Sequence, residues 1–149
     1  MEFKSVKSTD PLIPHSLLIE ADPNESAVKA YLSRSRILLG IEGGRVLGAA
    51  VYEITHEEAC LWNICVCKTH RRKGLGAELI DEMSTLVRLE GIKSLLVGTG
   101  NSSLGPLAFY QRCGFRMDSI RKGFFESYHP PIYENSIRCI DMLMLRKYL

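Results

Sequence analysis

Three apolar, β-rich runs follow one another with only short polar turns between them, and this feature constrains the fold most. The runs cover residues 37–41, 46–55 and 59–67. The first turn, residues 42–45, contains the Gly-Gly pair of a tight hairpin, and residues 56–58 form the second turn. The sequence therefore predicts a meander of three consecutive antiparallel strands.

The periodicity changes immediately after the third run. From Gly74 to Glu90, apolar residues recur at helical spacing and polar residues occupy the other face. Gly91 is a natural C-terminal stop for this helix. The apolar positions are Leu75, Leu79, Ile80, Met83, Leu86 and Val87.

Two helices and one strand are expected before the meander. Residues 2–6 read as a strand and residues 16–21 as a short helix. A second helix is expected to run to about Ser33, with Asp22 as its cap, Pro23 in its first turn and Glu25 completing a capping-box spacing.

The C-terminal part alternates strands with a short helix. We expect a strand at 94–97, a loop at 98–101, a helix at 106–113, and strands at 115–121 and 137–145. An aromatic, proline-containing connection, residues 128–135, separates the last two strands. The pattern predicts one mixed α/β domain over residues 1–149.

Composition limits the classes of function. The 149 residues are 46% hydrophobic, and 19 Lys plus Arg against 17 Asp plus Glu give a net charge of +2. This balance argues against a protein that coats nucleic acid. No apolar run approaches the roughly 20 residues of a membrane span, and the first residues lack a signal-peptide pattern. The five cysteines include no C-x-x-C pair, so we expect no disulfide framework, no metal site and a cytoplasmic location.

The segment between the third strand and the long helix carries the first chemical signal. Its sequence, Arg71-Arg72-Lys73-Gly74-Leu75-Gly76, has the form R-x-x-G-x-G. A helix N-terminus offers unpaired N–H groups and a positive dipole end, and the glycines let an anion approach the backbone. The spacing is neither that of a P-loop nor G-x-G-x-x-G. The segment predicts a pyrophosphate site, and the alternative is a glycine-containing turn with a solvated basic face.

A second motif changes the interpretation. Residues 108–115, Ala-Phe-Tyr-Gln-Arg-Cys-Gly-Phe, place Tyr110 four residues before a Gly-Phe pair on a short helix that leads into a strand. With both motifs in this order after a meander, the sequence resembles the GNAT superfamily of N-acetyltransferases from about residue 37 to residue 145. The resemblance implies a mixed, mostly antiparallel central sheet of about six to seven strands flanked by helices.

The resemblance also implies a cofactor site. Acetyl-CoA would be the co-substrate, with no metal. The backbone of Ile64, Cys65 and Val66 would hold the pantetheine arm like an added strand, and an N–H there would stabilise the oxyanion. Residues Arg71, Arg72, Lys73, Gly74, Leu75, Gly76 and Ala77 would hold the pyrophosphate.

The resemblance assigns the catalytic role to Tyr110, which would donate a proton to the departing thiolate. The family often has an Asn seven residues before this Tyr, where this sequence has Ser103. Asn101 or Ser103 would make that cofactor contact instead. Cys65 is expected to be a packing residue and not a nucleophile.

A general base is not evident. Where some family members carry a Glu, on the strand before the Tyr helix, this sequence has Gly98. An ammonium group with a pKa near 10.4 must lose a proton before it attacks. The remaining candidates are Glu53, His56, Glu57, Glu58 and Glu134, beside a water chain or an acceptor that arrives neutral.

The expected function is acetyl transfer to a primary amine by direct attack in a ternary complex. The expected acceptor is a small-molecule amine, selected by the N-terminal helices and the 128–135 connection, where Glu134 and aromatic rings would hold a cation. The alternatives are acetylation of a protein Lys or N-terminus, and an acyl-CoA-binding sensor without turnover. We expect a monomer or homodimer that engages neither nucleic acid nor membrane.

Overall fold

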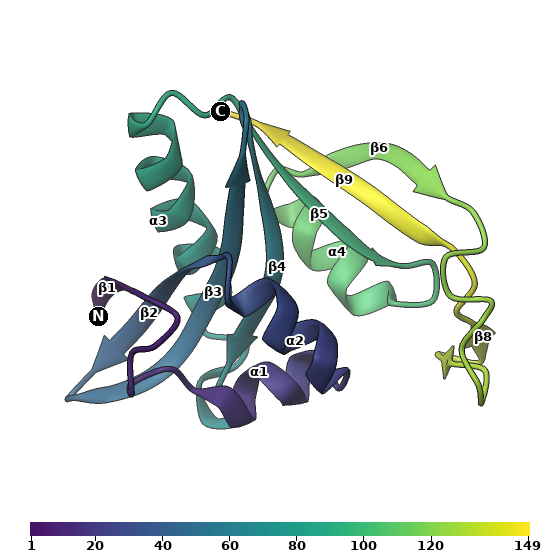
Figure 1. The fold of residues 1–149 in the computed structure, drawn as a ribbon, viewed down its shortest axis with the longest axis horizontal. Helices are drawn as coiled ribbons and strands as arrows, with labels where there is room; N and C mark the ends of the chain where they lie inside the picture. The colour runs from purple at the N-terminus through teal and green to yellow at the C-terminus, as the bar shows by residue number, and fades with distance from the viewer. The chain divides into compact units, whose positions relative to one another are not determined.

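Residues 1–93 build a four-stranded antiparallel sheet in the computed structural model, which describes residues 1–149 (Figure 1). The predicted meander forms as β2 (Arg36–Glu42), β3 (Arg45–Thr55) and β4 (Glu58–Val66). Strand β1 (Glu2–Val6) pairs with β2. One register shift, between Val51 and Tyr52, leaves Trp62 of β4 without an opposite residue.

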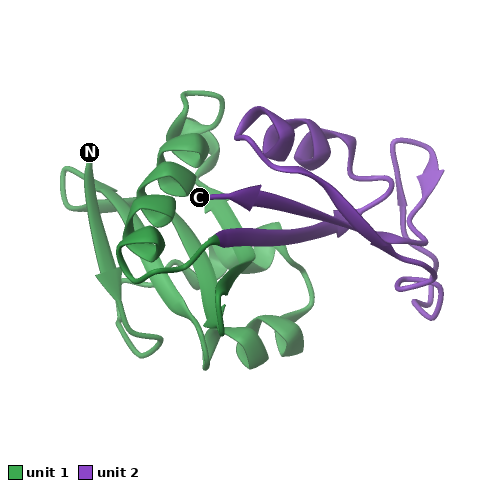
Figure 2. Ribbon diagram, turned by 90° about the horizontal axis from the view of Figure 1, so that it is seen from above, with its two compact units in different colours: residues 1–93 green, residues 94–149 purple.

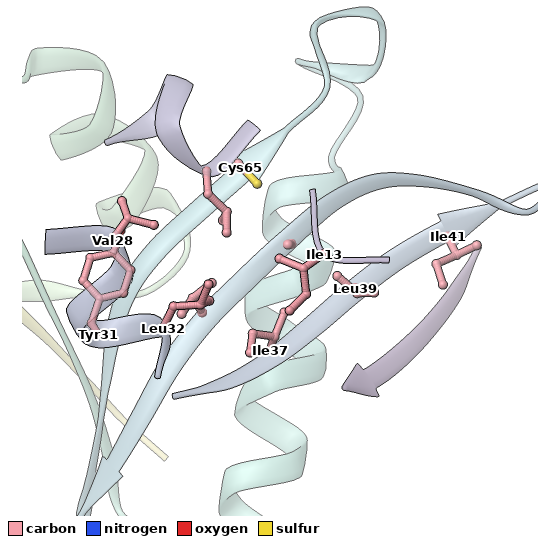
Figure 3. Close-up of a cluster of buried hydrophobic side chains, with 11 residues drawn as sticks. Ile13, Val28, Tyr31, Leu32, Ile37, Leu39, Ile41 and Cys65 are labelled. Carbon is pink, nitrogen blue, oxygen red and sulfur yellow. The ribbon is translucent and has the colours of Figure 1, made fainter. Parts of the chain in front are cut away.

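Helices cover both faces of this sheet. Alternate strand residues, such as Leu39, Val51 and Cys65, pack with side chains of α1 (His15–Ala21) and α2 (Glu25–Leu32) (Figure 3). The glycines Gly40 and Gly48 face the other way, toward α3 (Leu75–Leu89). Because side chains alternate across a strand, one sheet supports two helical layers.

The start of α2 differs from the prediction. Asn24 is the N-cap, and its Oδ1 accepts the N–H of Ala27 at 3.1 Å. The predicted cap, Asp22, instead accepts the hydroxyl of Tyr31 at 3.0 Å and the N–H of Asn24 at 3.3 Å. The Asp22 side chain is used in the contact with Tyr31 of α2. With Asn24 as the cap, Pro23 precedes the helix and Glu25 is its first residue.

Residues 94–149 form the second compact unit (Figure 2). Its three strands are antiparallel in the order β5 (Ser94–Gly100), β9 (Met142–Tyr148) and β6 (Arg116–Arg121). Helix α4 (Leu104–Arg112) follows β5, and a small hairpin pairs β7 (Tyr133–Glu134) with β8 (Ile137–Arg138).

Three boundaries of this unit correct the predictions. Strand β5 continues through residues 98–100, which were expected to be a loop. Its glycines fit there because a Cβ at Gly98 would meet Met142 Sδ at 2.8 Å, and one at Gly100 would meet Cys139 Sγ at 2.6 Å. Helix α4 begins two residues early, at Leu104. The expected strand 137–145 is divided between β8 and β9, which extends to Tyr148.

None of the helices combines the length and apolar character that a membrane crossing requires. All five cysteines are free thiols.

Gly48 tests the close packing behind β4. A Cβ at this position would lie 2.6 Å from the carbonyl oxygen of Cys65, a backbone atom that cannot rotate away. We expect Gly48→Ala to lower the free energy of unfolding by about 1–3 kcal/mol in urea titrations. Gly105→Ala is the control, because a Cβ there meets open space; since Pro106 disfavours a helical conformation for a residue with a Cβ, we expect no gain and a smaller loss than at Gly48. Equal stability of both variants would contradict the packing.

Candidate functional site

A short loop joins the end of β4 to α3 and carries the R-x-x-G-x-G sequence. The 3-10 turn η1 (Lys68–His70) is followed by two left-handed residues, Arg72 (φ 62°) and Gly74 (φ 86°). Left-handed residues in such a loop turn successive N–H groups toward one side and create an anion-binding concavity. The conformation is uncommon for a residue other than glycine, so the strain at Arg72 marks this loop as a functional candidate.

The first turn of α3 extends the concavity. Gly74 is the N-cap, no side chain caps the helix, and the first helical bond runs from Glu78 N to Gly74 O at 3.0 Å. The N–H groups of Leu75, Gly76 and Ala77 therefore have no helical partner and lie at the positive end of the helix dipole. The predicted diphosphate residues thus share one loop with the geometry that an anion requires.

Arg71 is the exception within that loop. Its Nη2 donates to Glu20 Oε1 of α1 at 2.6 Å, and its Nε donates to the carbonyl oxygen of Val66 at 2.9 Å. The side chains of Arg72 and Lys73 are exposed. The structure therefore places two of the three basic side chains in solvent and the third against the protein.

The pairing of β4 with β3 decides which backbone groups of β4 point outward. Cys67 N donates to Leu47 O at 2.7 Å, and Cys65 lies opposite Ala49. Hydrogen-bonded pairs alternate along an antiparallel ladder, so Cys65 directs its backbone toward β3. Ile64 and Val66 direct theirs away from β3. Of the three predicted arm residues, these two present the backbone groups, and Cys65 presents a side chain to the core.

The environment of Cys65 agrees with packing. The side chain is buried in the cluster beneath α1 and α2. Burial raises the pKa of the thiol to about 12, although a backbone hydrogen bond at Ala49 opposes this. Because the thiolate is the nucleophile, this thiol is unsuited to covalent catalysis at neutral pH.

In the second unit, Tyr110 projects from α4. The centroid of its ring lies 5.4 Å from the ring centroid of Phe109 and 5.6 Å from that of Phe115, with the Phe115 contact edge-on. The residue is only 9% exposed, yet no hydrogen bond to its hydroxyl is recorded. Burial raises the pKa of Tyr110 to about 12, with Cys113 adding to the shift. The phenol is therefore neutral over the physiological range and retains its proton for donation.

Asn101 and Ser103 have partners inside the second unit. Asn101 Oδ1 accepts the N–H groups of Ile140 and Asp141 at 2.8 and 3.0 Å, and its Nδ2 donates to Arg138 O at 3.1 Å. The Ser103 hydroxyl donates to Glu134 Oε1 at 2.9 Å. Both residues brace the connection before β9, and their predicted contact with the cofactor arm stays a prediction.

The candidate bases differ in their surroundings. Glu53 Oε1 accepts Trp62 Nε1 at 3.1 Å and Arg34 Nε at 3.0 Å, which commits it to a surface cluster. Position 98 has no room for a carboxylate, because Met142 and Met144 fill the space beside the glycine. Glu134 is exposed at the N-terminal end of α4. His56, Glu57 and Glu58 lie at the turn between β3 and β4.

Sequence reasoning missed polar links from the two N-terminal helices to β4 and to the loop that follows it. Asn63 Nδ2 donates to Leu18 O at 2.9 Å and to the Tyr31 hydroxyl at 3.0 Å. Glu20 binds Arg71, 51 residues further along the chain. No spacing in the sequence signals these links, since each depends on how the helices lie across the strand.

The sequence matches the model of the Acetyltransferase (GNAT) family over residues 10–115, more than half of the chain. The chain belongs to the GNAT acetyltransferase family. The N-acetyltransferase YvbK of Bacillus subtilis (strain 168) is 35% identical over 133 residues, 88% of this chain and 86% of that protein.

Solved structures agree with this assignment. A GNAT family acetyltransferase from Elizabethkingia anophelis with acetyl-CoA bound has a TM-score of 0.90 and 34% identity, covering 99% of this chain and 97% of that one. An IAA acetyltransferase from Bacillus cereus ATCC 14579 has a TM-score of 0.88 and 36% identity, covering 99% of both chains.

These likenesses confirm three expectations. The chain has the GNAT fold, with four α-helices and, besides the small β7–β8 hairpin, seven strands divided between the two units described above. It is an N-acetyltransferase that uses acetyl-CoA. Its acceptor and its individual site residues stay predictions.

The alkaline pH dependence of stability tests the burial of Cys65. The folded protein keeps the thiol protonated up to about pH 12, whereas an unfolded thiol ionises near pH 8.5. Between these values only the unfolded state has lost the proton, so the free energy of unfolding falls as pH rises, by about 1.4 kcal/mol per pH unit for one group. Denaturant titrations between pH 9 and 10 should show a shallower fall for Cys65→Ala.

The matched control is Val51→Ala, which removes buried side-chain volume from the same cluster and no titrating group. It should keep the wild-type slope. Equal slopes for Cys65→Ala and wild type would contradict the burial.

Proposed function

We propose that this GNAT acetyltransferase transfers the acetyl group directly from acetyl-CoA to a primary amine in a ternary complex, and that the acceptor is a small molecule. The observation that carries the proposal is Tyr110, a buried tyrosine that packs against Phe109 and Phe115 and whose hydroxyl makes no hydrogen bond within the protein. When the amine nitrogen bonds to the acetyl carbonyl carbon, the C–S bond must break and the thiolate needs a proton. A neutral phenol supplies one.

The backbone of β4 supplies the complementary charge. Ile64 and Val66 direct their N–H groups away from β3, as the pairing register requires. An N–H aimed at the carbonyl oxygen stabilises the negative charge that develops there during attack. We assign this role to the Ile64–Val66 segment and the diphosphate contacts to the loop amides of residues 72–77.

The acceptor assignment draws on Glu134. Its Oε1 accepts the hydroxyls of Ser102 at 3.0 Å and Ser103 at 2.9 Å, while no hydrogen bond or ion pair to Oε2 is recorded. A carboxylate with one oxygen held by two hydroxyls keeps its other oxygen for charge pairing with an ammonium group. We propose that this segment holds the ammonium form of the acceptor before its proton passes to solvent.

An acceptor panel tests the function. Protein and acetyl-CoA are mixed with small primary amines, with peptides bearing a free N-terminus and with lysine peptides, while free thiol release is recorded. Release that depends on small amines supports the proposal. Release with peptides alone overturns the small-molecule acceptor, and tight acetyl-CoA binding without any amine-dependent release identifies a sensor.

Gly76 tests the diphosphate site. A carboxylate at the start of α3 would lie against the anion and oppose it, so Gly76→Asp should abolish CoA binding in calorimetry. Gly76→Asn is the control, because it matches Asp in size without the charge. We expect Asn to retain more affinity, and the difference should shrink as salt rises. Equal loss in both variants would mean that crowding, and not charge, is responsible.

Tyr110 tests the acid. Tyr110→Phe removes the hydroxyl and keeps the ring between Phe109 and Phe115. We expect kcat to fall by about 10²-fold or more, the range of general-acid contributions, with CoA affinity nearly intact. Tyr148→Phe, at a tyrosine that is 76% exposed, should behave as wild type. Full turnover in Tyr110→Phe would remove this residue from the mechanism.

A further inference from the structure

We infer that Glu20 is a positioning residue of the acetyl-CoA site, acting through Arg71, and this inference rests on the proposed function of the loop. The family resemblance alone would place the Arg71 side chain on the diphosphate. In the structure that side chain bridges Glu20 of α1 and the carbonyl oxygen of Val66, at 2.6 and 2.9 Å. The loop that receives the anion is thereby tied to a helix on one face of the sheet.

The first part of the argument is which carbonyl Arg71 occupies. The backbone of Val66 points away from β3, so its carbonyl belongs to the outward edge that pairs with the pantetheine arm. With Arg71 bound there, the carbonyl oxygen of Val66 has an acceptor role inside the protein and is not left for the arm. Arg71 therefore fixes Val66 as the residue at which backbone pairing between β4 and the arm would end.

The second part is what holds Arg71 in place. A guanidinium is a planar fork, and two edge donors on two fixed acceptors set its orientation. Val66 O alone leaves the fork free to rotate toward an incoming anion. Glu20 supplies the second acceptor, and α1 is itself anchored to β4 through Asn63 Nδ2 and Leu18 O at 2.9 Å. The carboxylate thus reaches Arg71 from a helix whose position over β4 is already defined.

The third part is charge. With Arg71 neutralised by Glu20, Arg72 and Lys73 provide the unpaired positive charge of the loop, and both are exposed. The ion pair itself is half exposed, at 45% for Arg71 and 52% for Glu20. Pairs of this kind contribute about 0.2–1 kcal/mol, so the expected effect of breaking it is small and must be measured by comparison.

The experiment is a double-mutant cycle with two ligands. Glu20→Gln, Arg71→Gln, Arg71→Lys and the double Gln variant are titrated calorimetrically with CoA and with ADP, which has the diphosphate but no arm. We expect each single variant to weaken CoA by about threefold and ADP much less. The double variant should be no worse than Arg71→Gln, and Arg71→Lys should resemble Arg71→Gln because an ammonium cannot reproduce the fork.

The control is Glu25→Gln, an exposed carboxylate in α2 with no recorded contact to the loop. It should bind both ligands as wild type does, and melting temperatures should confirm that every variant is folded. If Arg71→Gln weakens CoA and ADP equally while Glu20→Gln matches wild type, Arg71 is a direct diphosphate ligand and the inference is overturned. Retained affinity in Arg71→Lys overturns it as well. Wild-type protein that binds neither ligand would instead refute the proposed site as a whole.

Discussion

The antiparallel pairing of β3 with β4 is the constraint on which the candidate site depends. It consumes the backbone groups of Cys65 and Cys67 and leaves those of Ile64 and Val66 directed outward. It also brings Gly48 so close to Cys65 that no side chain fits, which lets α3 approach the sheet through Leu75 and Leu79. The same pairing therefore directs outward the backbone groups that we assign to the cofactor arm, and it positions the helix whose N-terminus we assign to the diphosphate.

The charged and polar residues around β4 make different kinds of contact. In the proposed diphosphate site the amides of the loop and of the start of α3 provide the donors. Arg71 connects that loop to Glu20, and Asn63 connects the strand to Leu18 and Tyr31. Asn63 is buried, and a buried polar group is costly unless it is hydrogen-bonded, so its two bonds help to hold α1 and α2 on their face of the sheet.

The second unit follows a similar logic with different residues. Asn101 bonds three backbone groups of the segment before β9, and the serines that follow it hold Glu134. This segment is thereby fixed to the N-terminal end of α4, the helix that carries Tyr110. The carboxylate of Glu134 and the phenol of Tyr110 thus belong to one unit, and hydrogen bonds within that unit hold the segment that carries Glu134.

Periodicity was sufficient to predict the meander and α3, and local motif chemistry was sufficient to predict a helix start with glycines after β4. Strand alternation, helical spacing and a glycine-containing helix start are properties of neighbouring residues, so they can be identified without knowledge of the rest of the chain. Side-chain partners are not such properties. Asp22 was predicted to cap α2, but it accepts the hydroxyl of Tyr31. The glycines of β5 were predicted to form a loop, but they lie in a strand where Met142 and Cys139 pack against them.

Only the tertiary structure decided where the side chain of Arg71 goes. Its sequence neighbours predict that it contacts a phosphate. Its side chain donates to Glu20, which lies 51 positions away along the chain and comes close because α1 packs against β4. A sequence records which donors and acceptors a chain possesses. Which of them meet depends on how distant elements pack, since hydrogen bonds act over about 3 Å and no local pattern reports contacts across the fold.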